Sequence, residues 1–227
     1  MNGDGNPTQN EIPDEKDHSE RNVDEDILYL RDCLADNHED EGIASVFSRF
    51  KPQLERVVDF RMDSRIRARV DANDVLQEAF LDVKNRYAEF VKSPTVSLFV
   101  WFRQLTLQVL IEFQRRHFRQ KRTVQKEIRI HAANVDQSDT SQLIARELVG
   151  QLTSPSQAAI KAEELDKLNH ALETMSETDR EILALRHFEQ LSNSEVAEII
   201  GIKPAAASNR YVRAITKLGE IMERLER

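Results

Sequence analysis

Arginine and lysine side chains concentrate in two segments of the sequence, and both have the chemistry of a polyanion-binding surface. The interval from Trp101 to His131 holds eight Lys and Arg residues against two Glu residues. From Pro204 to Leu218 there is no acidic residue. Such side chains neutralise phosphates, and Arg or Asn can also bond to base edges in the major groove. A nucleic acid is therefore the expected ligand. The alternative for each charge run is a solvated helix face.

Residues 192–218 have the pattern of two helices joined by a tight turn. Ser192 is placed to cap the first helix, and Glu195 can close a capping box. Gly201 falls where a helix end favours positive φ, and Pro204 suits the first turn of a second helix. This order is typical of a helix-turn-helix, whose second helix enters the major groove. An ordinary helical hairpin with a basic exposed face is the alternative.

The other basic segment is expected to lie on one long helix from Leu98 to about Arg122, apolar in its first half and basic in its second. Its aromatic residues could stack on bases, but core packing is the expected role of Trp101. Before it, Asp71 can cap a helix with an acidic polar face, and residues 92–97 should form a loop. A smaller basic patch precedes that helix: Arg61, Arg65, Arg67 and Arg69.

Charge is distributed unevenly along the 227 residues. The net charge is -8, yet residues 1–41 hold fourteen Asp and Glu against three Lys and Arg, so the remainder carries +3. The overall acidity therefore does not argue against nucleic-acid binding. The single Cys33 excludes an internal disulfide, and no apolar run approaches the roughly 20 residues of a membrane span. We expect a cytoplasmic protein without membrane insertion.

The sequence contains no constellation expected of an enzyme. Its six His residues are scattered, and none has a Cys, Glu or second His at metal-ligand spacing. There is no Gly-rich phosphate loop and no nucleophile elbow. We expect no catalytic residue, no metal and no cofactor. An enzyme would require that the acidic residues around 71–82 held a metal, and helix capping explains them more simply.

Helical periodicity along the chain, with no convincing strand, predicts an all-α protein of two small helical domains joined by a long linker. The expected divisions are a disordered acidic arm (1–25), an N-terminal helical domain (26–125), a linker (126–162) and a C-terminal helix-turn-helix domain (163–227). Within the N-terminal domain, Pro52 should start a new helical segment or kink an existing helix. A short amphipathic piece with Leu143, Ile144 and Leu148 interrupts the linker.

Three segments, in order, resemble bacterial sigma factors of the sigma-70 family, extracytoplasmic-function type. DANDVLQEAF (71–80) is similar to the segment that docks onto core RNA polymerase. WFRQLTLQVLIEFQRR (101–116) resembles the helix that reads and melts the -10 element, and residues 176–218 resemble the C-terminal domain that reads the -35 element. The resemblance covers about two-thirds of the chain.

The resemblance implies a role for particular residues. Polymerase binding would use Asp71, Asp74, Gln77, Glu78 and Phe80. Contacts to the -10 element would come from Lys92, Ser93, Gln108, Glu112, Arg115, Arg116, Arg119 and Arg122. Contacts to the -35 element would come from Ala205, Ala206, Ser208, Asn209, Arg210, Arg213 and Lys217. Residues 92–97 would capture a flipped base, and the linker would thread towards the RNA exit channel.

The resemblance also implies partners and leaves room for rival functions. The expected partners are the beta and beta′ subunits of core RNA polymerase and promoter DNA, with an anti-sigma factor as a further candidate. The chain would be a monomer when free and nucleoid-associated when bound to polymerase. Gln108 and Glu112 replace the Asn and Asp usual in the family. In the second helix of the helix-turn-helix, three consecutive Ala residues leave few side chains that can read bases. The alternatives are a free-standing helix-turn-helix regulator and a helical adaptor that binds no DNA.

Overall fold

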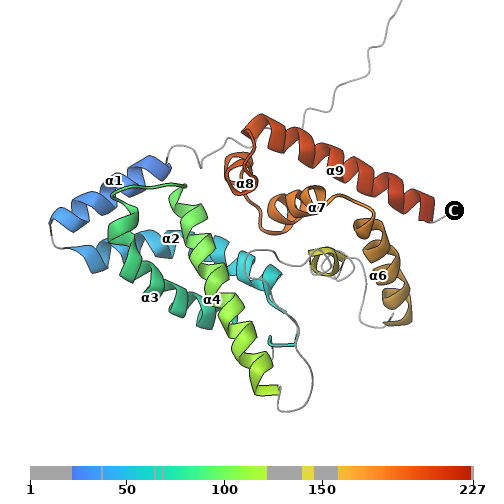
Figure 1. Cartoon of the computed structure of the whole chain (residues 1–227), viewed down its shortest axis with the longest axis horizontal. Helices are drawn as coiled ribbons and strands as arrows, with labels where there is room; N and C mark the ends of the chain where they lie inside the picture. Colours follow the sequence, from blue (N-terminus) through green and yellow to red (C-terminus); the bar gives the residue numbers. More distant parts are fainter. Residues whose placement is uncertain are drawn as a thin grey trace, which may run out of the picture.

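The computed structural model describes residues 22–36, 38–63, 65–67, 69–121, 140–145 and 158–225. In these ranges the chain is all-helical without strands, and its helices form two groups that lie side by side (Figure 1). The elements are α1 (Asn22–Ala35), α2 (Glu39–Arg61), α3 (Ala72–Phe90), α4 (Leu98–Lys121), α6 (Ala158–Glu173), α7 (Glu177–Leu183), the π-helix η1 (Ala184–Phe188), α8 (Asn193–Ile200) and α9 (Pro204–Leu225). The predicted all-α class with two helical units is confirmed.

Some predicted regions lie outside this description. They include residues 1–21 of the acidic arm, residues 122–125 with Arg122, and most of the linker, namely residues 126–139 and 146–157. The structure extends α1 back to Asn22, so the last four residues assigned to the arm are helical. No helix of the described ranges is both long and apolar enough to cross a membrane.

Helices α1 to α4 enclose a core in which aromatic rings meet at the centre. The rings of Phe47 and Phe102 lie edge to face at 5.4 Å, and Phe50 and Phe99 are 5.8 Å apart. Edge-to-face and tilted contacts of this kind add to the free energy of simple area burial. The core joins α2 firmly to the first half of α4, the half that the sequence predicts to be apolar.

Helix α2 continues through Pro52, so of the two predicted effects of this proline the start of a new segment is wrong. The proline lies inside one helix that begins at Glu39 and ends at Arg61, so it does not start a new segment. A proline removes one backbone hydrogen bond from a helix interior. Val46 and Leu54, on either side of it, are both completely buried, and we infer that this packing outweighs the lost bond.

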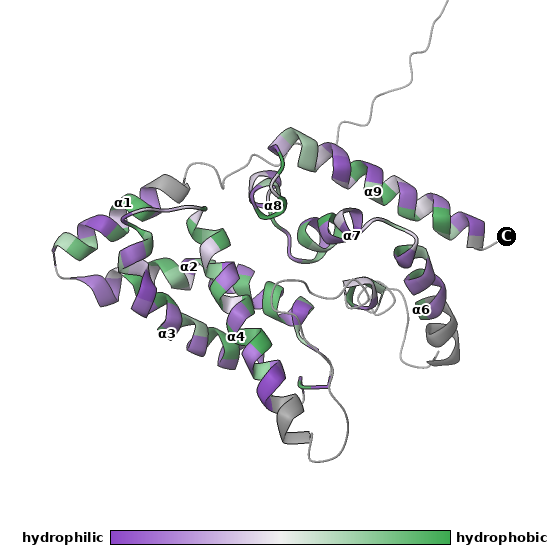
Figure 2. Ribbon diagram, viewed as in Figure 1, coloured by the Kyte–Doolittle hydropathy of each residue, from purple (hydrophilic) through white to green (hydrophobic). Residues whose placement is uncertain are grey.

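The predicted helix-turn-helix is confirmed at each of its local signals. The Ser192 side chain accepts a hydrogen bond from the backbone of Glu195, and the Glu195 carboxylate accepts one from the backbone of Ser192. Gly201 adopts the left-handed conformation with φ 75°, and Pro204 is the first residue of α9. In Figure 2, α9 alternates between hydrophilic and hydrophobic residues along its length, as an amphipathic helix does.

Two apolar clusters span the boundary between the helical groups. Ile182, Leu185 and Val196 of the C-terminal unit belong to the same buried cluster as the α2–α4 core. A second cluster joins Phe60 of α2 to α6, α7 and α9, and it includes Leu143, Ile144 and Ala145. The structure therefore holds the C-terminal unit directly against the N-terminal one, with part of the predicted linker between elements of both.

Candidate nucleic-acid interface

Helix α9 presents an exposed basic face of the kind the sequence predicts. Asn209, Arg213 and Lys217 are exposed at spacings of four residues, so they lie along one face of the helix. The Nε of Arg213 donates a hydrogen bond to the backbone oxygen of Asn209 at 3.3 Å, which directs the guanidinium along the helix surface. Three side chains of this kind can contact phosphates and base edges without first breaking a buried interaction.

The three consecutive alanines of α9 have different roles. Ala205 and Ala206 are exposed, whereas Ala207 is completely buried in the core cluster with Ala197 of α8. A larger side chain at either buried alanine would separate the two helices, because close-packed interiors tolerate little added volume. Ala207 therefore serves the crossing of α8 and α9, and only the other two lie where DNA could touch them.

Arg210 of α9 forms an ion pair with an acidic residue of α7. Its Nε lies 3.4 Å from the Oδ1 of Asp179 in α7, and the side chain is half-buried. Ser208, the residue before Asn209, is also half-buried. Of the seven predicted -35 residues, Arg210 is thus the one that the structure already pairs with an acid.

Helix α4 carries the predicted -10 residues on its second half, beyond the aromatic core. Gln108 and Glu112 are exposed one turn apart, and Arg115 and Arg116 follow on the next turn. Trp101 stacks on Phe90 at 4.3 Å, so its predicted role in the core is confirmed. The side chains of Arg119 and Arg122 lie outside the described part of the chain.

The loop before α4 is present as predicted. Residues 91–97 are non-helical, and Lys92 and Ser93 are exposed within it. The ammonium of Lys92 lies 3.5 Å from the carboxylate of Glu89. Ser97, at the end of the loop, donates its backbone N–H to the Oε1 of Glu198 in α8. One end of the loop is therefore attached to the helix-turn-helix.

The acidic face of α3 begins with the predicted cap. Asp71 accepts a hydrogen bond from the backbone of Asp74 at 2.8 Å, and the Asp74 carboxylate accepts one from the backbone of Asp71 at 3.1 Å. Both residues are exposed, and so is Gln77 on the next turn. Phe80 is half-buried, its ring 5.2 Å from Phe47, so it supports this face from the core side.

Sequence reasoning missed an apolar residue beside this acidic face. Leu81 is 58% exposed, and it lies one turn beyond Gln77 on α3. An exposed large aliphatic side chain next to carboxylates is suited to contact with another protein. The four-residue spacing from Gln77 is the signal that could have identified it.

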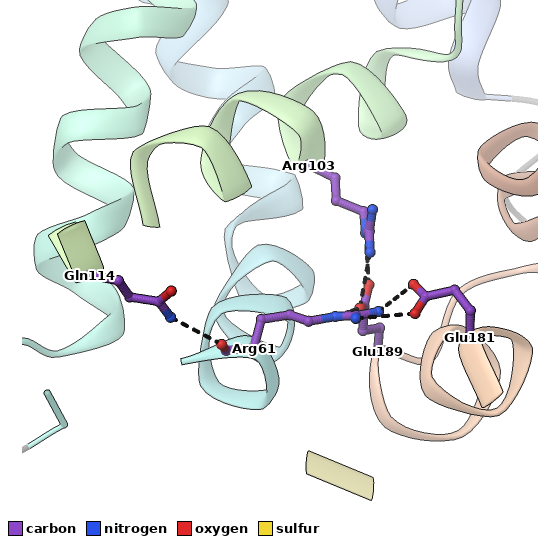
Figure 3. Close-up of polar contacts among 5 residues, drawn as sticks. All are labelled: Arg61, Arg103, Gln114, Glu181 and Glu189. Carbon is purple, nitrogen blue, oxygen red and sulfur yellow. Dashed lines mark hydrogen bonds and ion pairs between the residues drawn. The ribbon is translucent and has the colours of Figure 1, made fainter. Parts of the chain in front are cut away.

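A buried ionic network, also missed, links the two helical units (Figure 3). Arg61 of α2 donates from Nε to the Oε1 of Glu189 at 2.6 Å, and from Nη2 to Glu181 of α7 at 2.6 Å. Arg103 of α4 donates to Glu189 through Nε at 2.7 Å and Nη2 at 3.0 Å. The Glu189 side chain is completely buried. We call these four residues the buried network.

Neighbouring opposite charges keep Glu189 and Arg61 ionised although both are buried. Burial by itself would raise the pKa of Glu189, but attraction to Arg103 and Arg61 outweighs it and lowers the pKa to about 2. Burial would likewise lower the pKa of Arg61, and attraction to Glu189 and Glu181 instead raises it above its ordinary value. Glu189 and Arg61 are therefore both charged at neutral pH.

The basic patch predicted after α2 is corrected by this arrangement. Arg61 is buried in the network, and Arg65 pairs with Asp63. Arg67 donates to the backbone oxygens of Asp59 and Met62. Arg103, counted with the basic segment of α4, is buried as well. Arg61, Arg65 and Arg67 of the predicted patch therefore bind protein oxygens, whereas Arg69 is exposed.

Comparison with known proteins supports the C-terminal half of this description. Residues 165–218 match the family model described as sigma-70, region 4. No curated protein matches the chain by sequence. The chain is 16% identical, with TM-score 0.45, to the structure of CnrH in complex with the cytosolic domain of CnrY, over 88% of this chain and 97% of that one.

A second solved structure shows a similar degree of likeness. It is the sigma factor RpoE in complex with the anti-sigma factor NepR from Bartonella quintana, at 15% identity and TM-score 0.37, over 81% of this chain and 96% of that one. The matched residues 165–218 contain α7, η1 and α8 and most of α9, so they include the whole helix-turn-helix. The match confirms the predicted resemblance to the sigma-70 family over residues 165–218.

Proposed function

We propose that the chain is a sigma factor of the extracytoplasmic-function type, which binds core RNA polymerase and directs initiation at promoters with particular -10 and -35 elements. The observation that carries this proposal is the region 4 match over a helix-turn-helix whose α9 has an exposed face without an acidic residue from Pro204 to Leu218. In this role Asn209, Arg213 and Lys217 would contact the -35 element.

The N-terminal unit supplies the other two surfaces that such a factor needs. The exposed face of α3, with Asp74, Gln77 and Leu81, would bind core polymerase. The exposed residues Gln108 and Glu112 of α4, with the arginines that follow, would lie along the -10 element. Acidic residues on one helix and basic residues on the next separate a protein-binding surface from a DNA-binding one.

Transcription from DNA with purified core polymerase tests this function. Adding the chain should produce transcripts that begin at defined sites, and Arg213→Ala should reduce them at every such promoter. Loss of a phosphate contact should weaken binding and lower the slope of log K against log salt by about one unit, whereas loss of a base contact relaxes specificity at one position. Glu173→Gln, an exposed change at the end of α6, is the control.

A gel shift separates the proposed function from its main rival. A sigma factor should shift promoter DNA strongly only when core polymerase is present. Its two weak DNA-binding surfaces must be held at a fixed separation before they can bind together. A free-standing helix-turn-helix regulator would bind its operator equally well without polymerase. Tight binding by the chain alone, unaffected by added core enzyme, would overturn the proposal.

A further inference from the structure

The first three turns of α9 combine few hydrogen-bonding groups with several exposed methyl groups. Helix α9 lies along the outer edge of the C-terminal unit (Figure 1). Between Pro204 and Arg213 its exposed side chains are those of Ala205, Ala206, Asn209, Val212 and Arg213. Asn209 and Arg213 can bond to base edges, whereas the other three side chains end in methyl groups. Readout by hydrogen bonds alone would therefore rest on two side chains.

Val212 has the largest of these exposed apolar side chains. It is 56% exposed, and it lies one turn beyond Asn209 and two turns beyond Ala205, so the three residues form a strip along the helix. At about 1.5 Å per residue, Val212 lies about 12 Å along the helix axis from Pro204. The N-terminal turns of a recognition helix are the part that contacts base edges in the major groove. Val212 is therefore placed where such a helix reads bases.

Several polar groups around Val212 already have hydrogen-bond partners within the protein. The hydroxyl of Thr216 donates to the backbone oxygen of Val212 at 3.0 Å. The Nε of Arg213 donates to the backbone oxygen of Asn209 at 3.3 Å, and Arg210 is paired with a carboxylate of α7. Because these groups are engaged, few hydrogen bonds remain for base recognition on this face. Apolar contact has to supply part of the specificity.

The methyl group of thymine is the base feature that an exposed valine can recognise. In the major groove, thymine presents its C5 methyl beside the O4 acceptor, and the other three bases present no methyl there. Contact between this methyl and a valine removes apolar surface of both from water. Cytosine at the same place presents an N4 amino group, which a valine would leave without a hydrogen-bond partner. A valine in the groove therefore favours thymine.

The charges around Val212 favour DNA over a protein as its ligand. The sequence from Pro204 to Leu218 has no acidic residue, and the next acids, Glu220 and Glu223, lie in the last turns of α9. Acid-free surface can approach phosphates closely. A stable protein interface buries about 800 Å² on each partner, which requires an apolar patch larger than one valine.

We propose that Val212 reads the C5 methyl group of a thymine in the -35 element, beside the base that Asn209 contacts. This readout rests on the function proposed above, and it names a residue that determines which promoters are recognised. Burial of one methyl-sized group is worth about 0.8 kcal/mol, which is about fourfold in affinity. Replacing this thymine with uracil, which lacks only the methyl, should therefore weaken binding about fourfold.

Selection from random DNA tests the base preference without assuming a promoter sequence. The full chain, with and without core polymerase, is mixed with a pool of random-sequence duplexes, and the bound DNA is sequenced. The wild-type chain should enrich a motif with thymine at a position that Val212→Ala leaves less restricted. The remaining positions of the motif should be the same for both chains, since Val212→Ala changes one exposed side chain.

Uracil substitution then isolates the contribution of the methyl group. In the selected duplex one thymine at a time is replaced by uracil, and binding is measured by fluorescence anisotropy at fixed salt. The wild-type chain should lose about fourfold at one thymine, the value expected for one methyl-sized group, whereas Val212→Ala should bind both duplexes equally.

Ile215→Ala is the matched control for the loss of an exposed aliphatic side chain from α9. Ile215 is 45% exposed, and it lies about a third of a turn round the helix from Asn209 and beyond the first three turns. This variant should keep the wild-type discrimination between thymine and uracil. Loss of discrimination in Ile215→Ala as well would overturn the assignment to Val212.

The remaining outcomes separate this readout from the proposed function. Equal binding of thymine and uracil duplexes by the wild-type chain, or discrimination retained by Val212→Ala, would overturn the readout. Weaker binding of Val212→Ala to core polymerase with unchanged discrimination would do the same, and would make the valine a protein contact. If the wild-type chain enriches its motif equally without polymerase, the sigma function fails and the methyl readout is still decided by uracil. If no motif is enriched in either arm, both proposals fail.

Discussion

Glu78 on α3 and Arg116 on α4 form an ion pair in which Nη2 of the arginine lies 2.7 Å from Oε1 of the glutamate. The guanidinium also lies over the ring of Phe113, 4.6 Å from its centroid. The arginine and glutamate side chains are 54% and 39% exposed, and pairs of this exposure contribute about 0–1 kcal/mol. The proposed polymerase-binding face and the proposed DNA-binding helix are thus joined by a contact weak enough for either ligand to replace.

Glu78→Gln should therefore separate stability from binding. We expect the free energy of unfolding to fall by less than about 1 kcal/mol, and the affinity for core polymerase to fall clearly. Urea unfolding and fluorescence anisotropy with core enzyme measure the two quantities. Glu55→Gln is the matched control, since Glu55 pairs with Lys51 at 3.7 Å and is 40% exposed. Equal polymerase affinity in both variants would exclude Glu78 from the binding face.

Acid should weaken the folded chain through Glu189 in a defined pH window. Its pKa of about 2 lies below the ordinary value of 4.5, a difference worth about 3 kcal/mol. This stabilisation is complete above about pH 5 and is lost as the pH falls through about 2. Urea unfolding at fixed ionic strength should show a difference between wild type and Glu189→Gln that is constant near neutrality and shrinks in acid. A difference that stays constant down to about pH 2 would contradict the lowered pKa.

Local signals in the sequence were sufficient for the helix-turn-helix. The caps and the turn depend on interactions within one or two helical turns, so the residue types predict them directly. The residues concerned are Ser192, Glu195, Gly201 and Pro204. The extent of α4 was predicted for the same reason: its apolar run and basic run have one continuous helical period.

The buried network could not be predicted in this way. Glu189 lies 86 residues from Arg103 and 128 from Arg61 in the sequence, and nothing near it distinguishes it from an exposed glutamate. Leu143 and Ile144 were noticed as an amphipathic piece, yet their burial against Phe60 depends on how the units pack. Both features are products of tertiary contact between distant segments, which residue periodicity does not encode.

Two helical glycines should respond to alanine with opposite signs. A Cβ at Gly42 would lie 2.6 Å from Sγ and 2.8 Å from Cβ of Cys33, whereas a Cβ at Gly219 would meet nothing within 4 Å. Gly42→Ala should therefore destabilise by about 1–3 kcal/mol through overpacking. Gly219→Ala should stabilise by roughly 0.5–1 kcal/mol, because alanine restricts the unfolded chain and favours helix. Thermal unfolding of the two variants measures this, and a stabilising Gly42→Ala would show that α1 and α2 can move apart freely.

The stacked pair of Phe60 and Phe188 allows the junction between the units to be measured by a double-mutant cycle. Phe60 is 5% exposed, so Phe60→Ala should cost about 3–5 kcal/mol of unfolding free energy, and Phe188→Ala, at a half-buried ring, should cost less. If the units stay in contact in solution, the pair should show a coupling of about 0.5–1.5 kcal/mol. As a control, Phe60→Ala combined with Tyr87→Phe should show no coupling, because Tyr87 lies in the N-terminal core away from this stack. Additive losses for Phe60 and Phe188 would mean that the rings do not meet in the free chain. The contact between the two units would then lack its stacked rings.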